Sequence, residues 1–205
     1  SGRGSNLASL LAAFPPGEPS LGDDTPGRVA LVVSNVPDAP ALDRAREAGV
    51  PAVAVAWRRG EGSRAAFERE VQAALDRHGI DLICLAGFMR ILSPAFTARW
   101  SGRVVNIHPS LLPAFRGLHA QRQALAAGAR ESGCTVHLVD AGVDTGRILL
   151  QRRVPVHDGD SEATLAERIL EQEHRAYPAA VRALLRGEAP ADAAGDDGKT
   201  VEETR

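Results

Sequence analysis

The chain has 205 residues, of which 24 are lysine or arginine and 26 are aspartate or glutamate, and its formal net charge is −2. This length fits one domain with a substantial hydrophobic core. The balanced charge gives no electrostatic reason to expect nucleic acid or an anionic membrane surface as a partner. We therefore expect a small-molecule ligand.

Neither the cysteines nor the apolar runs point away from the cytoplasm. Cys84 and Cys134 form no C-x-x-C pair, and isolated thiols are typical of a reducing compartment. No stretch reaches the roughly 18 consecutive apolar residues of a membrane span. We expect a cytoplasmic protein with no membrane contact.

Strands and helices alternate along most of the chain. Short apolar runs, typical of strands covered on both faces, lie at 28–35, 51–57, 81–88 and 103–108. The patterns at 39–49 and 63–79 predict helices. Ser93 before Pro94 predicts the start of another helix, because serine caps helix N-termini and proline suits the first turn.

Two further strands and a long helix complete the predicted elements. The runs 134–140 and 147–156 are close enough in the sequence to pair antiparallel. An apolar stripe predicts a last helix from about Ser161 to Arg186, and Pro178 predicts a kink within it.

This order of elements predicts an α/β fold with a Rossmann-like open, mostly parallel sheet, helices on both faces and an antiparallel C-terminal pair. We place this domain at 1–187. After Gly187 the sequence has too few large apolar residues to support a core. We predict a disordered tail over 188–205.

Asn106 and His108 stand at the end of a predicted strand, where open α/β sheets bind their ligands. Alternation along a strand places both side chains on one face. An imidazole transfers protons near neutral pH, and an amide can donate a hydrogen bond to an oxygen that gains charge. On spacing alone, a loop histidine satisfied by backbone groups is the alternative.

Several long motifs point to one family. They are SGRGSNL (1–7), LAGFMRILSP (85–94), NIHPSLLPAFRGLHA (106–120), GCTVHLVDAGVDTGRILLQ (133–151) and GDSEATLAERILEQEHRAYP (159–178). Together they resemble the folate-dependent formyltransferases, and Pro109 with the GLHA segment resembles the phosphoribosylglycinamide formyltransferase branch. The resemblance implies formyl transfer from 10-formyltetrahydrofolate to glycinamide ribonucleotide in purine synthesis, by a monomer or weak homodimer and without a metal.

The resemblance also implies roles for individual residues. His108 would be the general acid/base, Asn106 would hydrogen-bond the formyl oxygen, and Asp144 would stabilise the protonated imidazole. The folate would contact Met89, Arg90, Ile91, Leu92, Asn106, Asp140, Ala141, Gly142, Val143 and Asp144, with Arg64 near its carboxylate tail. The phosphate of the ribonucleotide would bind at Gly4, Ser5 and Asn6, and Glu173 would hydrogen-bond its ribose or glycinamide portion.

Simpler interpretations exist for most of these residues. Asp144 could be an ordinary turn residue, Arg64 a solvated helix charge, and the glycine-rich segment 4–6 only a turn. Glu173 lies on the inward face of its helix and needs a hydrogen-bond donor, either an internal arginine or the substrate. His137, in an alternating strand, is predicted to be a structural histidine.

Two other functions stay open: a formyltetrahydrofolate hydrolase that passes the formyl group to water, and a folate- or nucleotide-binding module with weak catalysis. In this family an apolar strand precedes the glycine-rich turn, whereas this sequence begins on the turn. We expect the first strand of the fold to be missing from this chain. We therefore expect the runs 28–35 and 81–88 to flank a gap in the sheet.

Overall fold

The computed structural model describes residues 4–17, 25–58, 60 and 62–188, and the structural statements below refer to these residues. Except for Glu188, the predicted tail lies outside them.

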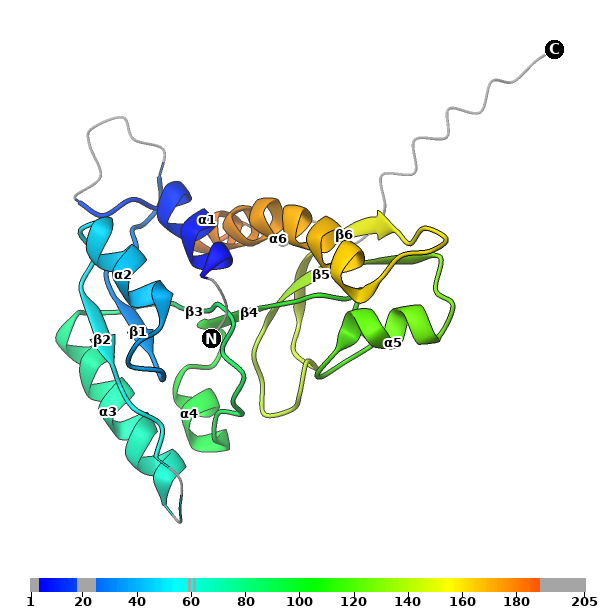
Figure 1. The fold of residues 1–205 in the computed structure, drawn as a ribbon. Coiled ribbons are helices and arrows are strands. Elements are labelled where there is room, and N and C mark those ends of the chain that lie inside the picture. The colour runs from blue at the N-terminus through cyan, green and yellow to red at the C-terminus, as the bar shows by residue number, and fades with distance from the viewer. Residues whose placement is uncertain (1–3, 18–24, 59, 61, 189–205) are drawn as a thin grey trace.

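The elements follow the predicted alternation of strands and helices (Figure 1). In chain order they are α1 (Ser5–Ala13), β1 (Val32–Ser34), α2 (Pro40–Glu47), β2 (Ala52–Ala54), α3 (Ser63–Arg77), β3 (Ile83–Leu85), α4 (Pro94–Arg99), β4 (Val104–His108), α5 (Ala120–Ala126), β5 (Glu131–Leu138), β6 (Ile148–Pro155) and α6 (Glu162–Leu185). The first three apolar runs contribute only three residues each to β1, β2 and β3. A strand also needs a hydrogen-bonded partner, and the extent of that partner cannot be read from one run.

The strands form two sheets. β1 pairs with β2 in parallel, and the second sheet has the order β3, β4, β5, β6. β3 and β4 are parallel, whereas β5 runs antiparallel to both β4 and β6. The predicted antiparallel pair is confirmed, and antiparallel pairing extends one strand further, to β4. Within the described part of the chain β1 and β3 share no ladder.

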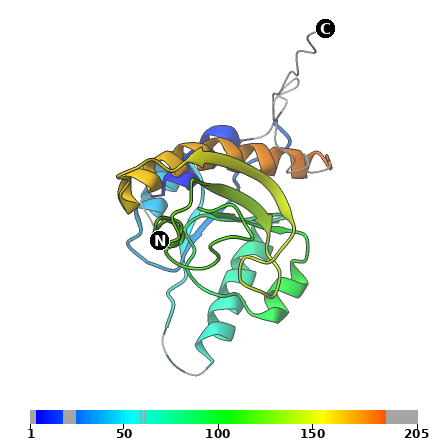
Figure 2. The same ribbon diagram turned by 90° about the vertical axis from the view of Figure 1, so that its right-hand side faces the viewer.

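Helices cover both faces of the larger sheet (Figure 2). Val105 of β4 packs in a core cluster with Ile169 of α6 and Leu10 of α1. Its neighbour Val104 packs with Phe96 of α4 in a second cluster that also includes residues of α3. Successive strand residues point to opposite faces. α1 and α6 therefore cover one face, and α3 and α4 cover the other.

Capping residues begin α4 and α6 where the sequence predicts them. The Ser93 hydroxyl accepts a hydrogen bond from the backbone N–H of Phe96 over 3.2 Å. Ser161 forms a capping box with Thr164. α6 then continues through Pro178 as one helix of 24 residues, so the proline does not break it. None of the helices described is long and apolar enough to cross a membrane.

Candidate active site

The carboxyl end of β4 carries the two polar side chains predicted to be catalytic. Asn106 and His108 alternate with Val105 and Ile107, which belong to the core cluster under α6, so the polar pair lies on the opposite face. His108 is only 5% exposed. Because few water molecules can reach a buried ring, its protein partners decide how its nitrogens are used.

Both ring nitrogens of His108 face acceptors. Nε2 lies 2.9 Å from the carbonyl oxygen of Phe115, and Nδ1 lies 3.4 Å from Oδ2 of Asp144. A carbonyl oxygen can only accept, so Nε2 carries a hydrogen. Asp144 is held in turn by the backbone N–H of Gly117, which donates to Oδ2 over 2.9 Å. The fold thus brings Asp144 to the predicted histidine.

His137 belongs to the same cluster, and it is buried with partners for both ring nitrogens, as expected of a structural histidine. Its Nε2 lies 3.3 Å from Nδ2 of Asn106 and 3.5 Å from Oδ1 of Asp144. Its Nδ1 lies 2.8 Å from the carbonyl oxygen of Leu138 and therefore carries the hydrogen. Burial lowers the pKa of His137, so the ring is neutral and Nε2 accepts from the Asn106 amide. Only the register of β4 with β5, which sets His137 opposite Asn106, reveals this contact.

No set of three or more histidine, cysteine, aspartate and glutamate side chains in the described ranges is arranged to hold a metal ion.

A second polar pair joins α1 to α6. Nδ2 of Asn6 donates to Oε2 of Glu173 over 2.7 Å, so the donor that Glu173 needs is not an internal arginine. Glu173 is 7% exposed, and burial raises its pKa although the Asn6 hydrogen bond opposes the shift. The other amide atom, Oδ1 of Asn6, is buried without a hydrogen-bond partner among the described residues. A buried carboxylate beside an unused acceptor suits a ligand that brings O–H or N–H groups.

The predicted phosphate-binding residues form the start of α1. Gly4 is the N-cap residue and has a φ of 72°, a left-handed conformation that favours glycine. Ser5 and Asn6 open the first turn, and no side chain of the described residues caps it. First-turn N–H groups and the helix dipole both favour an anion at this position.

Exposed apolar side chains gather in the segments predicted to contact the folate. Met89 is 67% exposed, Ile91 59% and Val143 48%. Leu118, which follows the Asp144-bound residue Gly117, is 68% exposed. Large apolar side chains in water commonly mark a ligand wall. Leu118 is absent from the predicted contacts because a loop leucine carries no chemical signal of its own.

The other predicted folate residues contact their neighbours in the protein. Leu92 packs against the cluster of α3 and α4. The Arg90 guanidinium lies 4.9 Å from the centre of the Trp57 ring. Asp140 accepts hydrogen bonds from the backbone N–H of Gly142 and the hydroxyl of Thr145, both in its own loop. Ala141, next to Asp140, is exposed.

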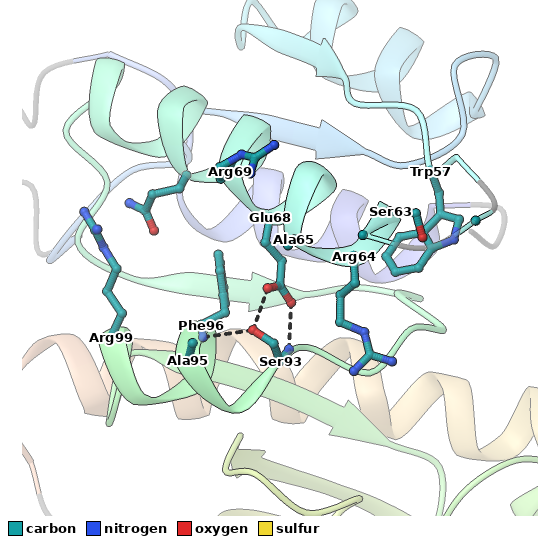
Figure 3. Close-up of a pocket in the computed structure, with 13 residues that line it drawn as sticks. Trp57, Ser63, Arg64, Ala65, Glu68, Arg69, Ser93, Ala95, Phe96 and Arg99 are labelled. Atoms are coloured by element: carbon teal, nitrogen blue, oxygen red, sulfur yellow. Dashed lines mark hydrogen bonds between the residues drawn. The ribbon is translucent and has the colours of Figure 1, made fainter.

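Arg64 lies apart from the catalytic cluster, in a pocket between α3 and α4 (Figure 3). The pocket has a volume of about 810 Å³, and its lining includes Trp57, Ser93 and Phe96 but none of the residues predicted to be catalytic. Trp57 links this pocket to the segment predicted to contact the folate, since Arg90 of that segment lies over the Trp57 ring.

Known proteins are similar to this chain in sequence and in fold. A family model described as Formyl transferase matches residues 1–181. The trifunctional purine biosynthetic protein adenosine-3 of Drosophila melanogaster is 48% identical over 92% of this chain, which spans only 14% of that protein's length. Phosphoribosylglycinamide formyltransferase of Mycobacterium tuberculosis is 48% identical, over 90% of this chain and 81% of its own. The solved structure of glycinamide ribonucleotide transformylase 1 from Symbiobacterium toebii matches with a TM-score of 0.81 at 45% identity, and the match covers 91% of this chain and 85% of that one. The chain therefore belongs to the formyl transferase family.

Proposed function

We propose that this chain transfers the formyl group of 10-formyltetrahydrofolate to the amine of glycinamide ribonucleotide, in purine biosynthesis. The observation that carries the proposal is the buried contact between His108 and Asp144 beside the Asn106 amide. The names of the relatives in Mycobacterium tuberculosis and Symbiobacterium toebii support this choice of substrate.

Proton transfer is the task of His108. The attacking amine must lose a proton and the departing folate nitrogen must gain one, and a single imidazole aided by water can serve both steps. The hydrogen on Nε2, which the Phe115 carbonyl oxygen accepts, is the proton available for exchange. Asp144 faces the other nitrogen and attracts the ring most strongly when Nδ1 also carries a hydrogen.

Asn106 stabilises the oxygen that gains charge when the amine attacks. Its amide nitrogen has two hydrogens, and His137 accepts only one of them. The second is free to bind the formyl oxygen. Because His137 already holds the amide, little reorganisation is needed as charge develops.

The remaining contacts divide between the two substrates. The Glu173 carboxylate would accept from the ribose or glycinamide portion of the ribonucleotide, and the start of α1 would hold its phosphate. The exposed apolar side chains around Met89 and Val143 would face the folate ring. We expect the enzyme to act in the cytoplasm, as a monomer or weak homodimer.

An absorbance assay for loss of 10-formyltetrahydrofolate, run with and without glycinamide ribonucleotide, tests the proposal. Turnover should require the ribonucleotide, and mass spectrometry should find the formyl group on it. The matched control is His108→Ala, prepared identically, because residual turnover in that sample would come from contaminating enzyme. Equal turnover without the ribonucleotide would indicate a hydrolase, and binding of both ligands without turnover a binding module. Either result would overturn the proposal.

A further inference from the structure

The loop of residues 109–119, which joins β4 to α5, supplies the acceptor for the His108 hydrogen. The carbonyl oxygen of Phe115 lies 2.9 Å from Nε2 of His108. Phe115 has a φ of 55°, a left-handed conformation that is strained for a residue other than glycine. Such a conformation persists only where the surrounding structure holds it. The position of this carbonyl oxygen therefore depends on what holds the loop.

Two neighbouring strand residues, Thr135 of β5 and Gln151 of β6, hold the loop from the sheet. They are partners in the register of the two strands. Nε2 of Gln151 donates to the carbonyl oxygen of Leu112 and to Oγ1 of Thr135, each over 2.8 Å. The Thr135 hydroxyl donates to the carbonyl oxygen of Ser110 over 2.6 Å and accepts from the backbone N–H of Leu112 over 3.0 Å. The sheet thus binds the loop backbone at residues 110 and 112.

These hydrogen bonds use every donor that the two side chains offer. A threonine hydroxyl has one hydrogen and two lone pairs, and all three are engaged in Thr135. The Gln151 amide nitrogen has two hydrogens, and both are donated. Thr135 and Leu112 are buried, so water cannot readily replace the Gln151 amide as their donor. Gln151 is therefore specific to this arrangement of the loop.

The hold on the loop extends to the residue before Phe115. The hydroxyl of Ser110 donates to the carbonyl oxygen of Ala114 over 2.6 Å, and Ala114 directly precedes Phe115. Gly133 of β5 lets the loop lie close to the sheet, since a Cβ at this position would lie 2.8 Å from Cδ2 of Leu111. A continuous set of contacts thus connects the sheet to the carbonyl oxygen that faces His108.

We propose that Gln151 is a positioning residue for His108, because it fixes the loop that presents the Phe115 carbonyl oxygen to Nε2. The inference rests on the proposed function in that His108 is the group that transfers the proton. Gln151 itself touches neither substrate in this assignment and acts through the loop. A carbonyl oxygen that accepts from Nε2 stabilises the protonated ring, which must carry a hydrogen there. A loop that is less well fixed should therefore lower the pKa of His108.

Gln151→Met tests the proposal, because methionine keeps the length of the side chain but has no donor. The pKa of His108 should fall by about 0.5–1 pH unit, a partial loss of a hydrogen bond to a charged group. The acidic limb of the pH–rate profile should move down equally, and kcat should fall about tenfold as the ring loses its alignment. Loss of folded protein alone would lower turnover without moving this limb. The substitution changes none of the charged or titratable side chains in the strands and loops around the ring: Arg116, His137, Asp140 and Asp144.

Matched variants locate the effect. Gln121→Met makes the same exchange at a half-buried position of α5 and should keep the wild-type pKa and kcat. A second pair serves if circular dichroism melts show that Gln151→Met folds poorly. Thr135→Ser keeps the hydroxyl and should behave as the wild type, whereas Thr135→Val has a similar shape without the hydroxyl and should lower the pKa of His108.

NMR titration of the His108 ring separates this inference from the proposed function, because it needs neither substrate nor turnover. The Cε1–H resonance is assigned by its absence in His108→Ala. A lower pKa in Gln151→Met, in a chain without ribonucleotide-dependent turnover, would support the positioning role and count against the proposed function alone. An unchanged titration in folded Gln151→Met, an equal shift in Gln121→Met, or equal titrations of the two Thr135 variants would overturn the positioning role.

Discussion

His108 and His137 face the two oxygens of the same carboxylate, Asp144, but differ in what else each ring contacts. The second nitrogen of His108 reaches a loop carbonyl oxygen, that of Phe115, whereas Nε2 of His137 also contacts the Asn106 amide. A ring that holds the Asn106 amide cannot swing to a substrate without releasing that amide. We therefore assign proton transfer to His108 and infer that His137 positions Asn106.

Replacing either member of the β4 pair tests these roles. His108→Ala and Asn106→Ala should each lower kcat about 100-fold or more, the size typical of a lost acid/base or oxyanion-stabilising group. Steady-state assays with both substrates measure the effect. Circular dichroism melts serve as the control for folding. A variant that keeps most of the wild-type turnover would remove that residue from the mechanism.

Glu173→Gln separates the stability of the fold from substrate binding. Burial raises the pKa of Glu173, so the folded state prefers the protonated carboxyl group. Below the ordinary value of 4.5 the group is protonated whether the chain is folded or not; as the pH rises through the higher folded value, the buried charge costs stability. The glutamine variant should therefore melt higher than the wild type at about pH 8, and the difference should vanish near pH 4.

The same substitution should weaken binding of glycinamide ribonucleotide about tenfold at neutral pH, because hydrogen bonds to a charged group are the stronger ones. Calorimetric titration of both proteins measures this. Equal affinities, or a glutamine variant that melts below the wild type at about pH 8, would show that Glu173 serves the fold and not the substrate.

At the scale of the elements, Tyr177 ties α6 to the two strands that lead into the site. Its hydroxyl oxygen lies 2.9 Å from the carbonyl oxygen of Leu85 in β3 and 3.0 Å from that of Val105 in β4. Tyr177 is fully buried, and this burial raises its pKa well above the usual range, so the hydroxyl stays a donor. One hydroxyl group thus lies against the backbone of both strands.

Tyr177→Phe should lower the free energy of unfolding by about 1–3 kcal/mol, because buried carbonyl oxygens lose their donor while the ring volume is kept. Urea denaturation, with the slope of the transition checked for two-state behaviour, measures the change. A loss below about 0.5 kcal/mol would show that these oxygens find other donors.

Across the whole molecule, α1 connects the two sheets. Leu7 belongs to the cluster with β1 and α2, whereas Leu10 belongs to the core under α6. The Asn6 to Glu173 hydrogen bond, which joins residues 167 positions apart, lies on this junction. A ligand that binds both residues should therefore stabilise the packing of the N-terminal elements on the larger sheet.

Glycinamide ribonucleotide at about 100 times its dissociation constant should add about 2.7 kcal/mol to the stability of the folded state. For a domain of this size that corresponds to a rise in Tm of about 5–10 °C. Differential scanning fluorimetry measures the shift, and Glu173→Gln at the same ligand concentration should show a smaller one. An equal shift in both proteins would place the ligand elsewhere.

Local features of this protein follow from the sequence alone. The alternation of β4 puts Asn106 and His108 on one face, and serines cap α4 and α6 at the predicted positions. These features depend on residues only a few positions apart, whose geometry one strand or one helical turn determines. The long motifs likewise indicate the formyl transferase family, and the match of residues 1–181 to the family model confirms that membership.

The tertiary structure alone decided which distant groups meet. His137 reaches Asn106 through the register of β5 on β4, and Asn6 reaches Glu173 through the packing of α1 on α6. Likewise, the contact of α3 with α4 sets Arg64 in its own pocket. A register shift of one residue would turn His137 to the other face without changing its strand pattern. Such contacts depend on how whole helices and strands pack against one another, and no local sequence pattern predicts that packing.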